Sequence, residues 1–288
     1  MPLKRRFLSS CMLSVNGYSI LTDCGEGTQV ALKTAGKKCG PIDMICITHF
    51  HADHISGLAG LLLTMSNEGR TEPVHIIGPV SLEYVVRSLC VVAPNLPFAL
   101  RFTEVRDSSP IFCKELKITP FPVLHSIDCI GYTFELAHKG KFDVMKAKKN
   151  EVPLPIWSAL QKNDTVFFNG KAYTSDMVLG KERKGIKVTY CTDARPGKSI
   201  KQNAANADLF ICEGMYAEDD KITKAVKKGH MLFSEAAALA KEANVTRLWL
   251  THFSPSLEDP ESKIQNAKAV FPDAECGYDG KNIDLKFD

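Results

Sequence analysis

Runs of apolar and β-branched residues alternate along the chain with stretches whose apolar positions recur about every 3.6 residues. The runs predict strands at 18–23, 44–48, 74–77, 116–123, 130–135, 186–192, 209–213, 247–251 and 283–287. The periodic stretches predict helices at 27–35, 53–67, 81–91, 231–243 and 261–270. Strands alternating with helices are typical of α/β proteins. The pattern therefore predicts an α/β fold with mixed sheets.

The segment 138–164, HKGKFDVMKAKKNEVPLPIWSALQKND, interrupts this rhythm. It gathers five lysines, namely Lys139, Lys141, Lys146, Lys148 and Lys149, ahead of two prolines and a tryptophan. A run of charges is usually a solvated connection between elements. The alternative is a protruding basic arm whose lysines contact phosphates. The pattern alone leaves both interpretations open.

Composition bounds the class of protein. The chain has 288 residues, of which 44% are hydrophobic and 24% charged, and this excludes disordered, collagen-like and coiled-coil classes. No Pro/Gly/Ser-rich linker divides it, so we expect a single domain over residues 1–288, with 138–164 inserted as an arm. The net charge of +3 is too small to indicate nucleic-acid binding by itself.

The apolar stretches and the cysteines bear on compartment. A stretch such as 58–65 is far shorter than the ~20 residues that cross a bilayer, and no apolar run follows the basic residues 4–6. Ten cysteines are scattered without a C-x-x-C pair. We therefore expect a soluble, cytoplasmic protein with no membrane partner.

The strongest chemical signal follows the predicted strand at 44–48. His49, His51, Asp53 and His54 lie within six residues. Imidazole nitrogens and carboxylate oxygens are ligands for zinc and similar divalent ions, and the spacing fits two metals. The plain alternative is a polar helix start capped by Asp53, but capping explains only that residue. The cluster therefore predicts metal binding.

Further ligand types stand directly after apolar runs elsewhere in the chain. These are His125, Asp193 and His252. Any one of them alone would more often be structural. Because strand ends deliver side chains to a shared sheet edge, the three together with the first cluster predict one site.

At these positions the sequence resembles the metallo-β-lactamase superfamily and, within it, the ribonuclease Z family of endonucleases that trim precursor tRNA 3′ tails. The matching segments are 23–29 (DCGEGTQ), 48–62 (THFHADHISGLAGLL), His125 with Gly131 and Tyr132, 192–195 (TDAR) and 250–252 (LTH). The resemblance implies an αββα sandwich of two mixed sheets, with a two-zinc site at one sheet edge.

The resemblance also implies which residues hold each ion. His49, His51 and His125 would bind one, Asp53, His54 and His252 the other, and Asp193 would bridge them. Asp23 would orient the histidine-rich loop. We expect two Zn²⁺ per chain, with Mn²⁺ as the alternative.

The basic segment falls where the family carries its tRNA-gripping exosite, and this favours the arm interpretation. The family's substrate loop maps onto 2–7 (PLKRRF), so Lys4 and Arg6 join the five arm lysines as predicted substrate-binding residues; Phe7 replaces an asparagine. The strand and Gly-Thr-Gly turn that precede this loop in the family are absent, as a truncated start would produce. The resemblance further implies a homodimer in which one subunit's arm serves the other's active site.

Two family motifs are altered. The His-Glu-Ala-Thr motif reads CEGM at 212–215 and keeps Glu213, and the His-Ser-Thr motif reads HML at 230–232 and keeps His230. We expect Asp53 to be both ligand and general base, and His230, helped by Glu213, to protonate the leaving 3′ oxygen. The plain alternatives are a buried, paired carboxylate and a histidine at a helix start.

The predicted function is metal-dependent, endonucleolytic removal of the 3′ trailer from precursor tRNA, leaving a tRNA 3′-hydroxyl and a 5′-phosphorylated trailer. One alternative is a hydrolase of the same fold acting on another RNA, a small phosphodiester, a thioester or a lactam. The other is a non-catalytic RNA-binding module.

Overall fold

The computed structural model describes Leu3 and residues 6–287, and it divides into two compact units. The first comprises Met1–Phe112, Lys117–Phe134 and Lys187–Asp284, and the second Cys113–Leu116, Glu135–Ile186 and Leu285–Asp288. The predicted arm, 138–164, lies within the second unit, which continues to Ile186. The predicted Lys4 lies outside the described residues.

A five-stranded sheet begins the first unit, in the order β1-β2-β3-β4-β5. Its strands are β1 Cys11–Val15, β2 Tyr18–Thr22, β3 Ile42–Cys46, β4 Val74–Gly78 and β5 Leu100–Glu104. β1 and β2 pair antiparallel around Asn16 and Gly17, both at positive φ as a tight hairpin requires, and the remaining pairs are parallel. Four helices belong to this half of the unit, namely α1 Thr28–Thr34, α2 Ala52–Ile55, α3 Leu58–Asn67 and α4 Leu82–Leu89, followed by the 3-10 helix η1 Cys90–Val92.

The second sheet has seven strands in the order β14-β13-β12-β11-β8-β7-β6. They are β6 Ile111–Cys113, β7 Leu116–Val123, β8 Cys129–His138, β11 Arg183–Cys191, β12 Leu209–Glu213, β13 Leu248–Thr251 and β14 Ala274–Cys276. Its helices are α7 Lys198–Ala204, α8 Ile222–Lys228, α9 Phe233–Glu242 and α10 Gln265–Lys268, with 3-10 helices η4 Asp219–Lys221 and η5 Glu261–Lys263.

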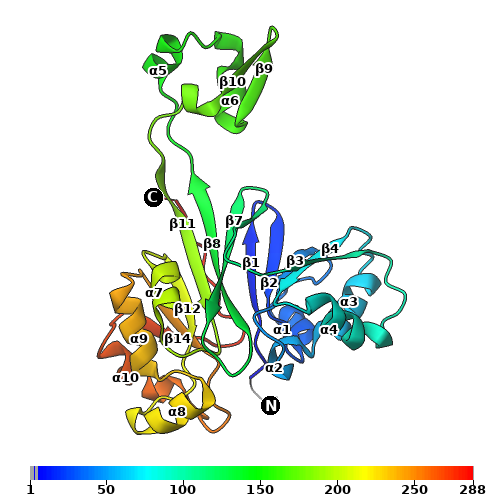
Figure 1. The fold of residues 1–288 in the computed structure, drawn as a ribbon, viewed down its shortest axis with the longest axis vertical. Helices are drawn as coiled ribbons and strands as arrows, with labels where there is room; N and C mark the ends of the chain where they lie inside the picture. The colour runs from blue at the N-terminus through cyan, green and yellow to red at the C-terminus, as the bar shows by residue number, and fades with distance from the viewer. Residues whose placement is uncertain (1–2, 4–5, 288) are drawn as a thin grey trace. The chain divides into compact units, whose positions relative to one another are not determined.

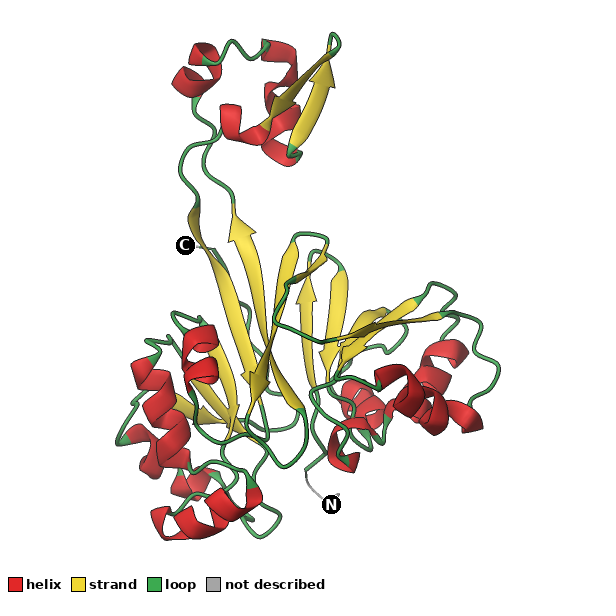
Figure 2. Cartoon of the chain, in the orientation of Figure 1, coloured by secondary structure: helices red, strands yellow, loops and turns green. Residues whose placement is uncertain are grey.

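Within the first unit the two sheets lie between two layers of helices (Figures 1 and 2), which is the αββα sandwich. The Tyr132 hydroxyl on β8 donates to the Ile47 carbonyl, 2.7 Å away and just past β3, and so joins the two sheets. Every residue of β12 is buried, as expected for a central parallel strand covered on both faces. β11, β12 and β13 run parallel, so their C-terminal ends meet at one edge of the sheet.

The second unit has a small core of its own. It contains α5 Val144–Lys149, η2 Leu154–Ile156, α6 Trp157–Lys162, the hairpin of β9 Thr165–Phe168 and β10 Lys171–Thr174, and η3 Ser175–Met177. Ala147, Leu160 and Val178 are fully buried at its centre. Because the core draws residues from both sides of position 164, the unit's packing includes the hairpin as well as the lysine-rich stretch.

Three sequence predictions differ from the structure by more than their boundaries. The helix predicted at 53–67 is two helices, α2 and α3, because the Gly57 N–H donates to the Cys24 carbonyl and the Asp53 carbonyl accepts from the Ser9 N–H, so these two groups do not bond each other as in a continuous helix. The helix predicted at 261–270 is the 3-10 helix η5 followed by the four-residue α10. The strand predicted at 283–287 is wrong. These residues have no strand partner, and Phe287 instead stacks on His138 with ring centroids 3.9 Å apart.

Candidate metal centre

The histidine-rich loop after β3 is held by Asp23, which follows β2 and is fully buried. The Asp23 carboxylate accepts hydrogen bonds from the Thr48 backbone N–H at 2.8 Å and from the Tyr190 hydroxyl at 3.2 Å, and lies 2.8 Å from His54 Nδ1. A buried carboxylate with this many donors holds its partners in fixed positions. Asp23 therefore orients the loop, as predicted from the sequence.

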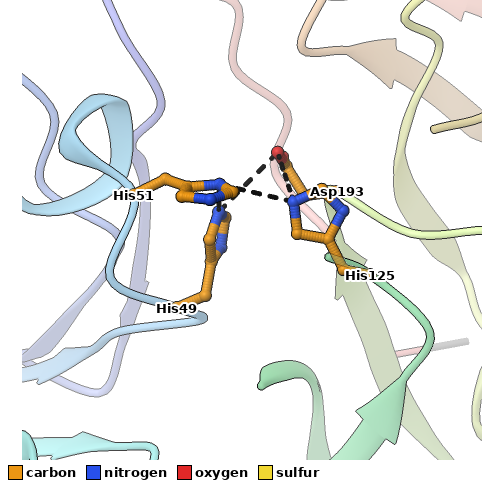
Figure 3. A group of neighbouring side chains, drawn as sticks. All are labelled: His49, His51, His125 and Asp193. Atoms are coloured by element: carbon orange, nitrogen blue, oxygen red, sulfur yellow. Dashed lines mark hydrogen bonds and ion pairs between the residues drawn. The ribbon is translucent and has the colours of Figure 1, made fainter. Parts of the chain in front are cut away.

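Four ligand atoms converge to form what we call the first ligand set (Figure 3). They are His49 Nε2, His51 Nδ1, His125 Nε2 and Asp193 Oδ2. The His49 and His51 nitrogens are 3.0 Å apart, those of His51 and His125 are 3.3 Å apart, and the Asp193 oxygen lies 3.6–3.7 Å from His125 and His49.

The second ligand set uses the other oxygen of the same aspartate. It consists of Asp53 Oδ2, His54 Nε2 and His252 Nε2, and Asp193 Oδ1 lies beside its two histidines. His230 also lies close enough to Asp193 and His252 to form a third possible group with them. The His54 and His252 nitrogens are 3.2 Å apart, and each lies 3.2 Å from the Asp193 oxygen. The Asp53 oxygen is 3.3 Å from His252 and 3.8 Å from His54. The two sets are therefore adjacent and share Asp193.

These distances fit divalent ions held by nitrogen and oxygen. Ligand atoms ~2.0–2.2 Å from a tetrahedral zinc ion stand roughly 3.3–3.5 Å from one another. Asp193 Oδ1 and His252 Nδ1 are buried and without a hydrogen-bond partner among the described residues. Facing imidazole nitrogens and an orphaned carboxylate oxygen are what a metal centre leaves when only its protein ligands are considered, so the His/Asp clusters are compatible with metal.

Three of the histidines are held through their second ring nitrogen. His49 Nδ1 lies 3.0 Å from the Thr48 hydroxyl, and His54 Nδ1 contacts Asp23. His125 Nδ1 lies 3.0 Å from the Gly229 carbonyl oxygen at the end of α8. Such contacts select the ring tautomer and orientation that a metal ligand needs. The contact of Gly229 was not predicted from the sequence. It is made by a backbone carbonyl, which every residue type has, so the identity of the residue does not indicate it.

The electrostatics of the clustered groups differ from one residue to the next. Burial opposes a charge on His54, but the carboxylates of Asp193 and Asp23 outweigh it and raise the pKa of His54 well above its usual value. Burial, reinforced by the neighbouring His54, lowers the pKa of His49 to about 2, so its imidazole is neutral. Burial alone would raise the pKa of Asp193, but the imidazoles of His252 and His54 outweigh it and hold that pKa well below its usual range.

Three of the site residues have a left-handed backbone. Asp23, Asp193 and His252 have positive φ, at 59°, 39° and 55°.

Glu213 and His230 form a pair beside the ligand sets. The fully buried Glu213 carboxylate lies 3.2 Å from His230 Nδ1 and accepts hydrogen bonds from the backbone N–H groups of Ala194 and Met231. Burial raises the pKa of Glu213. Burial also opposes a charge on His230, but the hydrogen bond and charge of Glu213 outweigh it and raise the pKa of His230. The pair therefore retains a proton readily, and the His230 ring stands 5.2 and 5.7 Å from those of His125 and His252.

The predicted substrate-binding residues lie in varied surroundings. Arg6 donates to the carbonyls of Ser254 and Leu257, so its guanidinium is engaged by the protein. Two arm lysines make internal contacts, Lys139 with Asp164 and Lys146 with the Leu179 carbonyl, both at 2.8 Å. The other three, Lys141, Lys148 and Lys149, are exposed. Substrate binding by these residues stays a prediction.

The fold and the paired His/Asp sets define a hydrolase of the metallo-β-lactamase class. Family models agree, since the beta-lactamase superfamily domain matches residues 177–253 and the family of the anti-Pycsar protein Apyc1 matches residues 3–91. Human tRNase Z, short form, has the same fold in its crystal structure, with a TM-score of 0.70 and 24% identity over 99% of this chain and 95% of that chain.

Sequence relatives are more specific. The ribonuclease Z of Agathobacter rectalis is 52% identical and that of Lachnoclostridium phytofermentans 51% identical, each alignment covering 100% of this chain and 95% of the relative. The chain belongs to the ribonuclease Z family. Among the described residues, no helix has the length and apolar character needed to span a membrane.

Proposed function

We propose that this protein is an endoribonuclease that removes the 3′ trailer from precursor tRNA by hydrolysing one phosphodiester bond. The observation that carries the proposal is the pair of ligand sets that share Asp193, in a chain about half identical to proteins named ribonuclease Z over its full length. A small-diester hydrolase or a non-catalytic RNA-binding module would share the fold but not cut precursor tRNA at a defined nucleotide.

The first ligand set would hold one divalent ion and the second another, with one oxygen of Asp193 directed at each. Imidazole nitrogens and carboxylate oxygens favour Zn²⁺, with Mn²⁺ as the alternative. When bound, paired ions of this kind lower the pKa of water toward ~7 and polarise a phosphate oxygen.

The protein's own groups would move the protons. Asp53 is the most exposed carboxylate of the second set, with its side chain 34% accessible, and burial is outweighed there by the His252 hydrogen bond, which holds its pKa well below the usual range. It is therefore ionised, as a metal ligand and a general base both need to be, and it would accept the proton of the attacking water. His230 Nδ1 lies 3.2 Å from the Glu213 carboxylate, so a protonated His230 would donate there through Nδ1 and have Nε2–H to protonate the leaving 3′ oxygen.

The RNA would be held by cations beyond the metal centre. Lys141, Lys148 and Lys149 of the second unit are exposed and form no ion pair with another described residue, so they can contact backbone phosphates. By the same family resemblance, we propose a homodimer in which the second unit of one subunit serves the metal centre of its partner. Light scattering at several protein concentrations tests the dimer, and a monomer at all of them would contradict it.

The deciding experiment is incubation of the metal-loaded protein with a 3′-extended tRNA, followed by mapping of the cut and of both new ends. We expect one cut, a 3′-hydroxyl on the tRNA and a 5′-phosphate on the trailer. Asp193→Ala is the inactive control. Turnover of bis(p-nitrophenyl) phosphate without any cut in the tRNA would favour a small-diester hydrolase, and binding without turnover of either would favour an RNA-binding module.

A further inference from the structure

Arg195 stands two residues after the shared ligand Asp193 and is tied to the loop that carries His230. Its guanidinium donates to the His230 carbonyl at 2.6 Å. The same guanidinium meets the Glu235 carboxylate in a fork, with Nη1 and Nη2 donating at 2.7 and 2.5 Å. Its backbone N–H donates to the carbonyl of Leu124, which precedes the ligand His125.

Glu235 closes the network from the other side. It lies in the first turn of α9, and its Oε2 also accepts from the Leu232 backbone N–H at 2.9 Å. The side chains of Arg195 and Glu235 are only 17% and 21% exposed. Bidentate arginine–carboxylate pairs with limited water access are both stronger and more directional than surface ion pairs.

His230 is thereby fixed at two points. Its ring is held by Glu213, and its carbonyl is held by Arg195. The peptide that follows is also held, because the Met231 N–H donates to Glu213. His230 sits in the short loop between α8 and α9, and its own N–H donates to the Ala225 carbonyl at 3.0 Å. The Arg195–Glu235 fork adds a hydrogen bond on the carbonyl side of the same residue.

We propose that Arg195 and Glu235 are positioning residues for the proton donor, acting on the leaving-group step and not on the metals. This inference rests on the proposed function, in which His230 protonates the leaving 3′ oxygen. Displacing a reacting group by about 1 Å can slow a reaction ~10²-fold. Loosening the fork should therefore slow only cleavage that needs a proton on the leaving oxygen.

The substitutions are Arg195→Lys, which keeps the charge but cannot form the fork while bonding the His230 carbonyl, and Glu235→Gln, which keeps the shape but loses the charge. Glu242→Gln is the matched control, since Glu242 also belongs to α9 and pairs with a cation, Lys201 at 2.9 Å, but in an exposed position. Each variant is checked for metal content and thermal unfolding before kinetics.

Two substrates separate the roles. In precursor tRNA the leaving group is a 3′ oxygen, which needs a proton. In bis(p-nitrophenyl) phosphate the leaving group is p-nitrophenolate, a stabilised anion that does not. We expect Arg195→Lys and Glu235→Gln to slow single-turnover tRNA cleavage about 10- to 100-fold and to change p-nitrophenyl release by less than about 3-fold. Glu242→Gln should change neither.

The decisive experiment repeats both substitutions in a His230→Ala background. There they should add little, because residues that act through one group are not additive. Equal slowing of both substrates, or a full additional loss in the His230→Ala background, would overturn the positioning role. If His230→Ala itself cuts tRNA at the normal rate, the proposed proton donor fails instead, and the two failures are thus distinguished.

Discussion

The candidate metal centre and the second unit place their polar groups in opposite ways. In the metal centre, ligands such as His49 and His54 are fully buried, and each is held by a second contact to a neighbouring side chain. In the second unit, three of the five predicted arm lysines are exposed. Bond-breaking chemistry needs groups fixed in advance, whereas phosphate contacts tolerate flexible cations whose attraction depends on salt.

The largest expected effect comes from the residue that both ligand sets share. We expect about two divalent ions per chain in the wild type. Asp193→Ala should lose tightly bound metal and reduce tRNA cleavage by more than the ~10- to 100-fold typical of removing an outer-shell partner. Elemental analysis and single-turnover cleavage measure this, with the exposed Asp284→Ala as control. One ion in the wild type, unchanged in Asp193→Ala, would show that the sets do not form a two-metal centre.

His230→Ala should act next most strongly, and without touching the metals. We expect unchanged metal content and tRNA affinity, with cleavage about 10²- to 10⁴-fold slower, because general acid help of this size is removed. A histidine that only caps a helix would instead lower the melting temperature and leave the single-turnover rate intact.

Removing the second unit should separate binding from chemistry. Because its core spans both sides of residue 164, the whole stretch 139–182 is best replaced by a short Gly/Ser link between β8 and β11, whose ends are already adjacent through the Arg183 Nε bond to the Lys139 carbonyl. We expect metal content and bis(p-nitrophenyl) phosphate turnover to remain and precursor tRNA binding to weaken strongly. If tRNA binding and cleavage stay normal at ~0.15 M salt, the second unit only connects β8 to β11 and takes no part in RNA binding.

The smallest effect should come from charge alone. Substituting Lys141, Lys148 and Lys149 by glutamine should lower the slope of log affinity against log salt by ~0.7–0.9 for each phosphate that is no longer neutralised by a lysine. A control that substitutes Lys37, Lys38 and Lys241, exposed lysines of the first unit, makes the same charge change. Equal changes in slope for the two variants would show that the arm lysines act only through net charge.

The same contrast decides how much could be predicted from the sequence. The clustering of the predicted ligands could be predicted because histidines and aspartates directly after apolar runs are unusual, and parallel strands bring their ends to one edge. The fork of Arg195 with Glu235 was not, since it depends on side chains 40 residues apart meeting in the folded chain. The contacts of Arg6 with carbonyls about 250 residues away are a second example.

Two of the predicted elements were wrong for a similar reason. The pattern at 53–67 is helical throughout, and the helix is divided where the Gly57 N–H donates to the Cys24 carbonyl from another part of the chain. The apolar residues at 283–287 alternate like a strand but have no strand edge to pair with. Periodicity predicts which side chains of a segment can be buried. It does not predict which element the segment packs against or pairs with, because that depends on the rest of the fold.

The positive φ angles of Asp23, Asp193 and His252 link this site to folding stability. A left-handed backbone at a non-glycine residue costs roughly 1–2 kcal/mol, so these three positions together remove several kcal/mol from a total that is only about 5–15 kcal/mol for a typical domain. Glycine at Asp193 or His252 would relieve that strain and also delete a ligand. Seven other non-glycine residues among those described also have positive φ, so this cost is shared with the turns of the fold. Metal binding to the folded chain would add stability that offsets part of it.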